Sequence, residues 1–467
     1  MYDASRETKT ICALASGSGS GAISIIRLSG PDSFKIIKQA CLSLASKKLE
    51  THRVYLSHFY KNKTLIDQVL VTCFEHGKSY TGEETVEISC HGSHHIVTKI
   101  LETLIELGAV SAEKGEFTFR AFMNGKLDLV QAEAVLSVIE SQTDASLNLS
   151  LRQLEGRVSK IFADIEDKLT WCLAHIEASI DFSTEGIDVV DNNVLIQKLS
   201  DISVTLKQIV NSYAAGRVLK NGVKVVLAGQ PNVGKSSLLN SLVLEDRAIV
   251  TNIAGTTRDV VQSSTVYNGL KFDISDTAGL RETSDIVENI GVERSKQEIK
   301  NSDITLFVYD MATGLTFEDL KQAEALVGRV ILVGNKKDLF NNEINAQLLK
   351  DSKALAALNR NITILDTLAV SALEVLTRDI ILSKISSIYK QNEYSDDSII
   401  TSSRQFEYSS QALSLIIQNI DELNAGMGNE YVAQTLKQAL INIQSILGRV
   451  FDDQIMDRVF KEFCLGK

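Results

Sequence analysis

Eight residues, Gly229-Gln230-Pro231-Asn232-Val233-Gly234-Lys235-Ser236, decide the fold of the central part of this chain. They match the phosphate-binding loop pattern G-x-x-x-x-G-K-[ST]. The apolar run 223–228 before the loop predicts a buried strand, and the run 237–242 after it predicts a helix. In this order the glycines let backbone N–H groups wrap a phosphate, and the helix start adds its positive dipole end. We therefore expect Lys235 on the β- and γ-phosphates of a nucleotide and Ser236 on Mg²⁺.

Three later motifs stand at the ends of predicted strands. Asp276-Thr277-Ala278-Gly279 ends one of them, where the aspartate holds the metal through water and the glycine N–H senses the γ-phosphate. Asn335-Lys336-Lys337-Asp338 follows the apolar strand 330–333. In the GTPase superfamily, which this part of the chain resembles, that motif reads guanine, because its aspartate takes the ring N–H and the exocyclic amine. Ser371-Ala372-Leu373, after the strand 362–370, resembles the last guanine-contacting loop.

The stretch 248–259 lies where the first switch of such a site is expected. Thr257 is the natural Mg²⁺ ligand, since a threonine there closes over the γ-phosphate. The amide oxygen of Asn232, with nearby switch carbonyls, suits a monovalent cation where other systems place an arginine finger. Beyond the switch, Asn268-Gly269 between two β-rich runs predicts a hairpin.

Leu280 stands where most small GTPases carry a water-orienting glutamine. An apolar side chain cannot orient water, so another residue must support hydrolysis. The candidates in the following switch are Arg281, Glu282, Asp285 and Glu288. For each acidic residue taken singly, a solvated helix face is the alternative interpretation.

Composition limits the classes of protein to consider. A chain of 467 residues predicts two to four domains. We expect neither a membrane span nor a signal peptide, because no apolar run is long enough and the N-terminus lacks a basic segment followed by an apolar core. Six scattered cysteines fit a reducing, cytoplasmic location. A net charge of −11 argues against a broad basic coat, so any RNA binding must use a local patch or a partner's surface.

The first 120 residues predict a compact α+β domain with strands at 10–14, 22–28, 68–75 and 85–90 and helices at 32–45 and 94–107. Gly17, Gly19 and Gly21 lack the G-x-G-x-x-G spacing and precede a strand, which favours a plain turn over a dinucleotide loop.

Helical patterning dominates both flanks of the nucleotide-binding segment. Apolar residues three or four apart between 147 and 180 predict one long helix, or two with a break near Gly156. Further helices are expected at 194–215, 403–423, 430–447 and 452–463. We favour one bundle into which the nucleotide domain is inserted over two separate bundles, because neither flank alone has enough helices to bury its apolar faces.

On these motifs the chain resembles the MnmE (TrmE) family of tRNA-modification GTPases, and the likeness spans its whole length. The segments that carry it are G-x-P-N-x-G-K-S-S-L-L-N at 229–240, I-A-G-T-T-R-D at 253–259, D-T-A-G-L-R-E at 276–282 and the terminal Cys464-Leu465-Gly466-Lys467. In the N-terminal part they are 26–30, 80–84, His91-Gly92 and 115–129.

The resemblance implies a multidomain α+β and α/β chain. The expected domains are an N-terminal folate-binding and dimerisation domain (1–122), a helical bundle (123–219 and 391–467) and an inserted Ras-like P-loop GTPase domain (220–390) with a mixed sheet flanked by helices. It also implies a potassium-stimulated cytoplasmic homodimer whose GTPase domains pair during hydrolysis. With a FAD-dependent partner, MnmG (GidA), in a heterotetramer, the family adds a carboxymethylaminomethyl or aminomethyl group to carbon 5 of the wobble uridine of certain tRNAs. A 5-formyl or methylene tetrahydrofolate is the implied one-carbon source.

The resemblance further assigns roles to residues. The expected GTP contacts are Asn232, Val233, Gly234, Lys235, Ser236, Ser237, Thr251, Asn252, Ile253, Ala254, Gly255, Thr256, Thr257, Asp276, Thr277, Ala278, Gly279, Asn335, Lys336, Asp338, Ser371, Ala372 and Leu373. The expected K⁺ ligands are Asn232, Thr251, Ile253 and Thr256, and the Mg²⁺ ligands are Ser236 and Thr257. Arg27, Glu87, Lys126 and Lys467 match folate-contacting positions. The expected catalytic residues are Lys235, Glu288, which positions the attacking water, and Cys464, for which a buried apolar filler is the alternative.

Two segments depart from the family pattern. The turn 15–21 is Ser-Gly-rich and lacks the family's arginine, and His91-Gly92-Ser93 replaces His-Gly-Gly. His91, His94 and His95 gather at one helix start with no acidic or cysteine partner, which favours a structural or folate-adjacent role over a metal site. Two other functions compete with tRNA modification: a regulatory or ribosome-assembly GTPase switch, and a folate-dependent one-carbon transferase whose GTPase domain is secondary.

Overall fold

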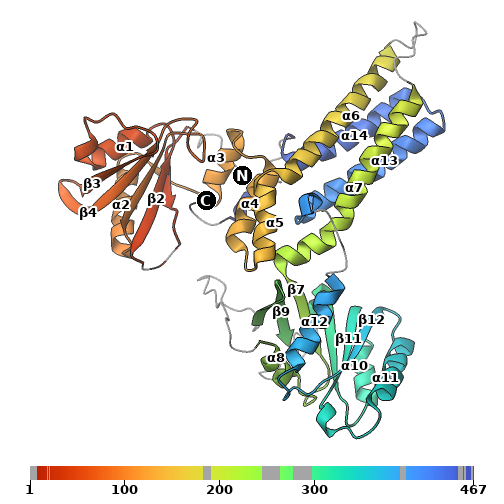
Figure 1. The fold of residues 1–467 in the computed structure, drawn as a ribbon. Helices are drawn as coiled ribbons and strands as arrows, with labels where there is room; N and C mark the ends of the chain where they lie inside the picture. Colours follow the sequence, from red (N-terminus) through yellow and green to blue (C-terminus); the bar gives the residue numbers. More distant parts are fainter. Residues whose placement is uncertain are drawn as a thin grey trace, which may run out of the picture. The chain divides into compact units, whose positions relative to one another are not determined.

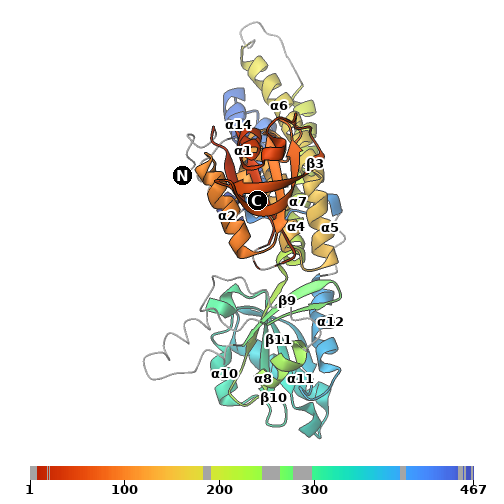
Figure 2. The same cartoon turned by 90° about the vertical axis from the view of Figure 1, so that its left-hand side faces the viewer.

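The computed structural model describes residues 8–17, 19, 21–181, 191–243, 263–276, 297–389, 396–450, 456, 459–463 and 466. The chain forms two compact units, each built from separate stretches of sequence (Figures 1 and 2). The first unit comprises Met1–Glu140, Ser150–Val210 and Ser403–Lys467, and the second comprises Ser141–Leu149 and Asn211–Ser402. No helix in these described ranges is both long and apolar enough to cross a membrane.

The first unit begins with a six-stranded sheet in the order β3-β4-β5-β2-β1-β6. Its strands are β1 (Ile11–Leu14), β2 (Ile23–Ser29), β3 (Arg53–Lys61), β4 (Thr64–Phe74), β5 (Thr85–His91) and β6 (Val110–Ser111). Neighbours run antiparallel except β1 and β6. The helices are α1 (Ser33–Ala40), α2 (His94–Glu106) and α3 (Glu116–Met123). Helices α1 and α2 pack on one face of the sheet, where Ile37 and Ile100 are fully buried against strand residues such as Ile26 (Figure 1).

Several features of this domain differ from the prediction, and β6 and α3 are among the elements that were not predicted. The single helix expected at 32–45 ends at Ala40, because Cys41 leaves the helical conformation (φ −117°, ψ 86°) and the short 3₁₀ turn η2 (Leu42–Leu44) directs Leu44 into the core. Strand β3 was not predicted. Its outward positions Val54 and Leu56 are apolar, whereas its inward position Ser57 is polar, so the alternation that marks a half-buried strand is missing.

The helical part of the first unit combines segments from both sides of the nucleotide-binding domain. It contains α4 (Leu129–Glu140), α6 (Arg157–Asp181), α13 (Ser403–Asn424) and α14 (Asn429–Leu447), together with parts of α5 (Asp144–Leu154) and α7 (Asn192–Asn221). Helix α14 packs against both α6 and α13 (Figure 1). Of the two possibilities for 147–180, the structure shows two helices, because Gly156 takes a left-handed φ of 81° between them. The three predicted domain boundaries stay predictions.

Ion pairs join the two halves of this bundle. Arg404 Nε lies 2.7 Å from Glu133 Oε1, and both side chains are 13% exposed. Gln405 donates to the other oxygen of Glu133 at 2.6 Å. Arg449 forms an ion pair with Glu166. Each contact joins a residue before the inserted domain to one after it.

The second unit holds a six-stranded sheet in the order β12-β11-β10-β7-β9-β8. Its strands are β7 (Val223–Ala228), β8 (Ser263–Tyr267), β9 (Leu270–Asp276), β10 (Ile304–Asp310), β11 (Gly328–Asn335) and β12 (Ile362–Ala369). All pairs are parallel except the hairpin β8–β9. Asn268 and Gly269 form its turn with φ of 49° and 78°, so the predicted hairpin is confirmed. The fold class is therefore the predicted one, with an α+β domain, a helical bundle and an inserted mixed-sheet domain.

Helices cover both faces of this sheet. They are α8 (Lys235–Val243), α10 (Phe317–Ala323), α11 (Ile344–Leu358) and α12 (Thr377–Tyr389), with the 3₁₀ turns η5 (Lys337–Leu339) and η6 (Asp396–Ser398). One core packs α8 and α12 against the sheet, and a second core packs α10 and α11 against its other face. Strand β7 lies between β9 and β10, so the chain continues to opposite sides of β7 in turn, which makes this position a topological switch point. Ligands bind at the carboxyl ends of strands beside such a switch point.

Helix α7 extends six residues beyond the predicted end at Ala215, to Asn221. It passes through Gly216, where a side chain would collide with the carbonyl of Ile400. The glycine thus permits close approach of the chain that leaves the domain, rather than ending the helix. Val218 beyond it is buried in the core of the second unit.

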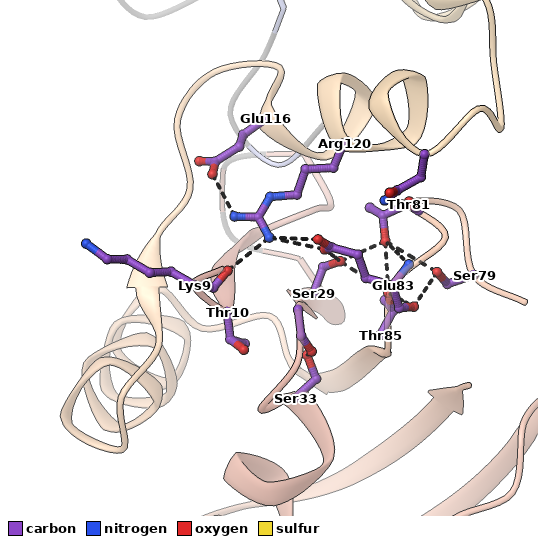
Figure 3. Close-up of polar contacts among 12 residues, drawn as sticks. Lys9, Thr10, Ser29, Ser33, Ser79, Thr81, Glu83, Thr85, Glu116 and Arg120 are labelled. Atoms are coloured by element: carbon purple, nitrogen blue, oxygen red, sulfur yellow. Dashed lines mark hydrogen bonds and ion pairs between the residues drawn. The ribbon is translucent and has the colours of Figure 1, made fainter. Parts of the chain in front are cut away.

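An arginine network stabilises the N-terminal domain (Figure 3). Arg120 on α3 is 4% exposed and contacts two carboxylates: its Nη1 lies 3.1 Å from both oxygens of Glu83, and its Nη2 lies 3.0 Å from Glu116 Oε1. Nη1 also donates to the carbonyl of Lys9 at 2.9 Å. Ser29 Oγ donates to Glu83 at 2.6 Å, which connects the network to β2. The network therefore holds α3 against the sheet.

We expect Arg120→Met to lower the free energy of unfolding of the N-terminal domain by about 3–5 kcal/mol, because it leaves buried carboxylates without their cation. The measurement is urea unfolding of the full chain, followed by hydrogen exchange in peptides from β2 and β5. Arg53→Met is the matched control, since its ion pair with Glu50 is exposed, and it should leave the transition in place. Equal transitions for both variants would contradict the structural role of the network.

Candidate functional site

The phosphate-binding loop joins the end of β7 to the start of α8. Gly229 has φ of 143°, and a side chain there would collide with the carbonyl of Val308 on β10. Gly234 has φ of 94°, and a side chain there would collide with the amide of Asn335. Both glycines are therefore required by close packing as well as by backbone conformation. Helix α8 begins directly after the loop, so its free N–H groups face the turn.

Lys235 is buried in this loop at 5% exposure. Its Nζ donates to the carbonyl oxygens of Gly229 and Gln230, at 2.8 and 2.7 Å. These bonds hold the ammonium against the loop, where it balances negative charge brought there by a ligand.

Ser236, in the first turn of α8, and Asp276, at the end of β9, meet beside the loop. Ser236 Oγ donates to Asp276 Oδ2 at 3.4 Å, and Asp276 is 8% exposed at the end of β9. A hydroxyl and a carboxylate oxygen are ligands that Mg²⁺ prefers, either directly or through water. The geometry thus fits a magnesium ion at this point.

Asn232 lies at the exposed tip of the loop and has a left-handed φ of 67°. Asparagine tolerates this conformation better than most residues. The other predicted K⁺ ligands lie outside the described residues, and so do several residues predicted to contact GTP or folate or to take part in catalysis. These are Thr251, Asn252, Ile253, Ala254, Gly255, Thr256, Thr257, Thr277, Ala278, Gly279, Glu288, Cys464 and Lys467.

Asn335 connects the phosphate loop to the loops predicted to read the base. It is 1% exposed, and its Nδ2 donates to the carbonyl of Val233 at 2.8 Å. Its Oδ1 accepts the N–H of Ala372 at 3.0 Å. The structure therefore brings the first, third and fourth predicted motifs together through one side chain. Ser371, also 1% exposed, lies beside this contact, and Leu373 is 86% exposed.

The predicted base-reading residue Asp338 lies on the 3₁₀ turn η5 and is exposed. Lys336 precedes it with φ of 60° and forms an ion pair with Asp310 at 2.7 Å. Asp310 was not predicted as part of the site. It ends the buried strand β10 as Asp276 ends β9, so the same signal, an aspartate at the carboxyl end of a central strand, was available to find it.

A second polar site lies on the N-terminal sheet. Arg27 on β2 faces Glu87 on β5, with Nε and Nη2 at 3.0 and 2.8 Å from Glu87 Oε1. The rings of Tyr80 and Phe117 each have their centroid 5.6 Å from the guanidinium carbon. Burial raises the pKa of Tyr80. Neither aromatic partner was predicted, and both lie within segments that carry the family resemblance.

Lys126, the third predicted residue of this site, contacts the loop that carries Tyr80. Its Nζ donates to the carbonyl of Gly77 at 2.5 Å. The structure thus joins Arg27 and Glu87 directly and places Lys126 against the same loop as the Tyr80 ring.

The Ser-Gly-rich turn before β2 packs on the end of β5. Gly21 donates to the carbonyl of Gly92 at 3.2 Å, and a side chain on Gly92 would collide with the carbonyl of Gly21. Asp67, buried on β4, accepts the N–H of His91 at 2.8 Å and lies 2.7 Å from its Nδ1. Asp67 orients the His91 ring and is an acidic partner that was not predicted for this histidine.

Two family models match the chain. The model described as "MnmE helical domain" matches residues 129–464, and the model described as "GTP-binding protein TrmE N-terminus" matches residues 10–126. The first match includes the inserted nucleotide-binding domain, as expected for a helical domain split by an insertion.

Curated relatives match over almost their entire length. A tRNA modification GTPase MnmE of Bdellovibrio bacteriovorus is 46% identical, with 100% of this chain and 99% of the relative covered. Proteins of the same name from Flavobacterium johnsoniae and Clostridioides difficile are 36% and 37% identical, with 98% of this chain and 99% of each relative covered. With one family model covering more than half of the chain and these relatives covering nearly all of it, the chain belongs to the MnmE family of tRNA modification GTPases.

Proposed function

We propose that this chain hydrolyses GTP to drive the modification of the wobble uridine in certain tRNAs. The observation that carries the proposal is the single side chain of Asn335, which ties the phosphate loop to the base-reading loops. A site of this construction can bind a whole guanine nucleotide, with the phosphates at Lys235 and the base at Asp338. Family membership supplies the link to tRNA.

At the phosphate end, each residue has a separate task. The loop N–H groups and the start of α8 bind phosphate oxygens. Lys235 holds the β- and γ-phosphates, while Ser236, Thr257 and, through water, Asp276 hold Mg²⁺. When bound, the metal neutralises charge on the phosphate oxygens. The residues predicted to contact GTP in the first switch and at 277–279 would complete the binding site around the phosphates.

Hydrolysis needs a group that positions water, and Leu280 cannot do so. We assign this task to Glu288. Asn232, Thr251, Ile253 and Thr256 would hold K⁺, which supplies the positive charge of an arginine finger. The exposed Asn232 amide at the tip of the loop is consistent with this assignment. GTPase domains that pair in the transition state would enclose the cation.

For the N-terminal domain we propose a tetrahydrofolate site at Arg27, Glu87 and Lys126, completed by Lys467. Two aromatic rings flank Arg27, so the site offers both apolar surface and charge. A carboxylate accepts hydrogen bonds from a pterin, and cationic side chains suit its anionic tail. The residues present therefore fit a folate, which supplies a one-carbon unit when bound. Cys464, three positions before Lys467 in the sequence, is the candidate for a further chemical role.

We also propose that two copies associate through their N-terminal domains. The face of the sheet opposite α1 and α2 exposes Val54, Leu56 and Leu70 at 56%, 62% and 45%. Exposed apolar residues gathered on one sheet face mark an interaction surface. The proposed assembly adds the FAD-dependent partner MnmG in a heterotetramer in the cytoplasm. With a net charge of −11, the chain would share tRNA binding with this partner.

Steady-state GTP hydrolysis in matched KCl and NaCl, at several protein concentrations, tests the cation site. We expect turnover at least about tenfold faster in KCl, because K⁺ replaces the charge that an arginine finger otherwise brings. Asn232→Gly keeps the left-handed backbone but deletes the amide, so it should bind GTP and lose the potassium effect. Equal rates in both salts would remove the cation from the mechanism.

Glu288→Ala tests the positioning of water. GTP binding should be unchanged, and single-turnover hydrolysis should slow by about 10²-fold or more. Glu324→Ala, which removes an exposed carboxylate at the end of α10, is the matched control and should hydrolyse GTP normally. Normal turnover in the Glu288 variant would assign the water to another residue.

A further inference from the structure

Two consecutive lysines of the base-reading loop are each held by a carboxylate from outside the motif. Lys336 Nζ lies 2.7 Å from Asp310 Oδ2 at the end of β10. Lys337 Nζ lies 2.6 Å from Glu374 Oε2 in the loop after β12. The lysine side chains are 35% and 25% exposed, so both pairs are partly shielded from water. The two ion pairs therefore connect the base-reading loop to the end of β10 and to the loop after β12.

The backbone conformation of the loop explains why these two ion pairs affect the position of Asp338. Lys336 has φ of 60° and ψ of 38°, a left-handed conformation that lysine rarely adopts. This residue leads into η5, which carries Asp338. The direction in which Asp338 points therefore depends on a backbone conformation that the side chain at 336 disfavours. An interaction that fixes this lysine stabilises that conformation.

The Asp310 carboxylate is held by a second contact, and the backbone of Glu374 is held in a turn. Asp310 uses Oδ1 to accept the N–H of Ala312 at 3.0 Å, which leaves Oδ2 for Lys336. Glu374 lies in a turn in which its N–H donates to the carbonyl of Ser371 at 2.9 Å. Lys336 therefore meets a carboxylate that is already oriented, whereas the Glu374 side chain is 42% exposed and only its backbone position is set by the turn.

We propose that Asp310 and Glu374 are positioning residues for guanine recognition. By holding Lys336 and Lys337, they keep the Asp338 carboxylate where it accepts both the ring N–H and the exocyclic amine of guanine. This inference rests on the proposed function of the site. The opposing explanation is that both pairs are ordinary surface ion pairs, which often contribute little.

The test compares equilibrium binding of GDP and of inosine diphosphate, which lacks the exocyclic amine, to the full chain. The wild-type chain should prefer GDP by at least about tenfold, since a hydrogen bond to a charged group is at stake. In Asp310→Asn and Glu374→Gln, GDP binding should weaken about three- to tenfold and inosine diphosphate binding much less. The ratio of the two affinities should therefore fall.

Two control variants separate positioning from folding. Asp366→Asn removes the ion pair between Asp366 on β12 and Lys384 on α12, away from the base loop, and should keep the wild-type ratio. Asp310→Glu retains the charge and should restore part of the preference. An equal loss for both nucleotides, or an unchanged ratio, in Asp310→Asn and Glu374→Gln would overturn the inference. Equal affinities in the wild-type chain would instead contradict the guanine site itself, and the positioning role with it.

Discussion

The side-chain amide of Asn335 sets the distance between the two ends of the nucleotide site. It is almost fully buried, and it bonds the phosphate loop with its nitrogen and the loop after β12 with its oxygen. Leaving either group without a partner in such a place costs about 1–3 kcal/mol. Gly234 makes this contact possible, because any side chain at that position would occupy the space of the amide. The glycine and the asparagine, 101 positions apart in sequence numbering, therefore act as one structural element.

The inserted domain leaves and re-enters the rest of the chain at neighbouring points. Within the second unit, Ser212 Oγ donates to the carbonyl of Ser398 at 3.1 Å and accepts the N–H of Ile400 at 3.2 Å. Gly216 lets the same returning segment approach helix α7. In the first unit, ion pairs connect the two flanks of the insertion, since Glu133 and Glu166 bind arginines that follow it in the sequence. The bundle consequently requires both flanks of the nucleotide domain.

Local signals in the sequence predicted the parts of the site whose chemistry depends on consecutive residues. The phosphate loop, the strand ending at Asp276 and the turn at Asn268-Gly269 were all predicted correctly, because glycines and strand ends mark them. Contacts between distant residues were not predictable in this way. Asp310 and Glu374 find their lysines only through the sheet order, and Tyr80 reaches Arg27 only after a loop folds back. Strand β3 was missed because its outward side chains are apolar.

In the proposed function, nucleotide turnover, and not folate chemistry alone, drives modification of tRNA. The most direct measurement is mass spectrometry of the wobble nucleosides of tRNA from a deletion strain that expresses either the wild-type chain or Lys235→Ala. Lys235 is the buried cation of the phosphate loop, so its loss should prevent productive GTP binding. We expect the wild-type chain to restore the 5-aminomethyl-type modification and the variant, expressed at the same level, to leave the nucleoside unmodified. Full modification by the variant would rule out a requirement for GTP turnover and favour a folate-dependent transferase in which the GTPase domain is secondary.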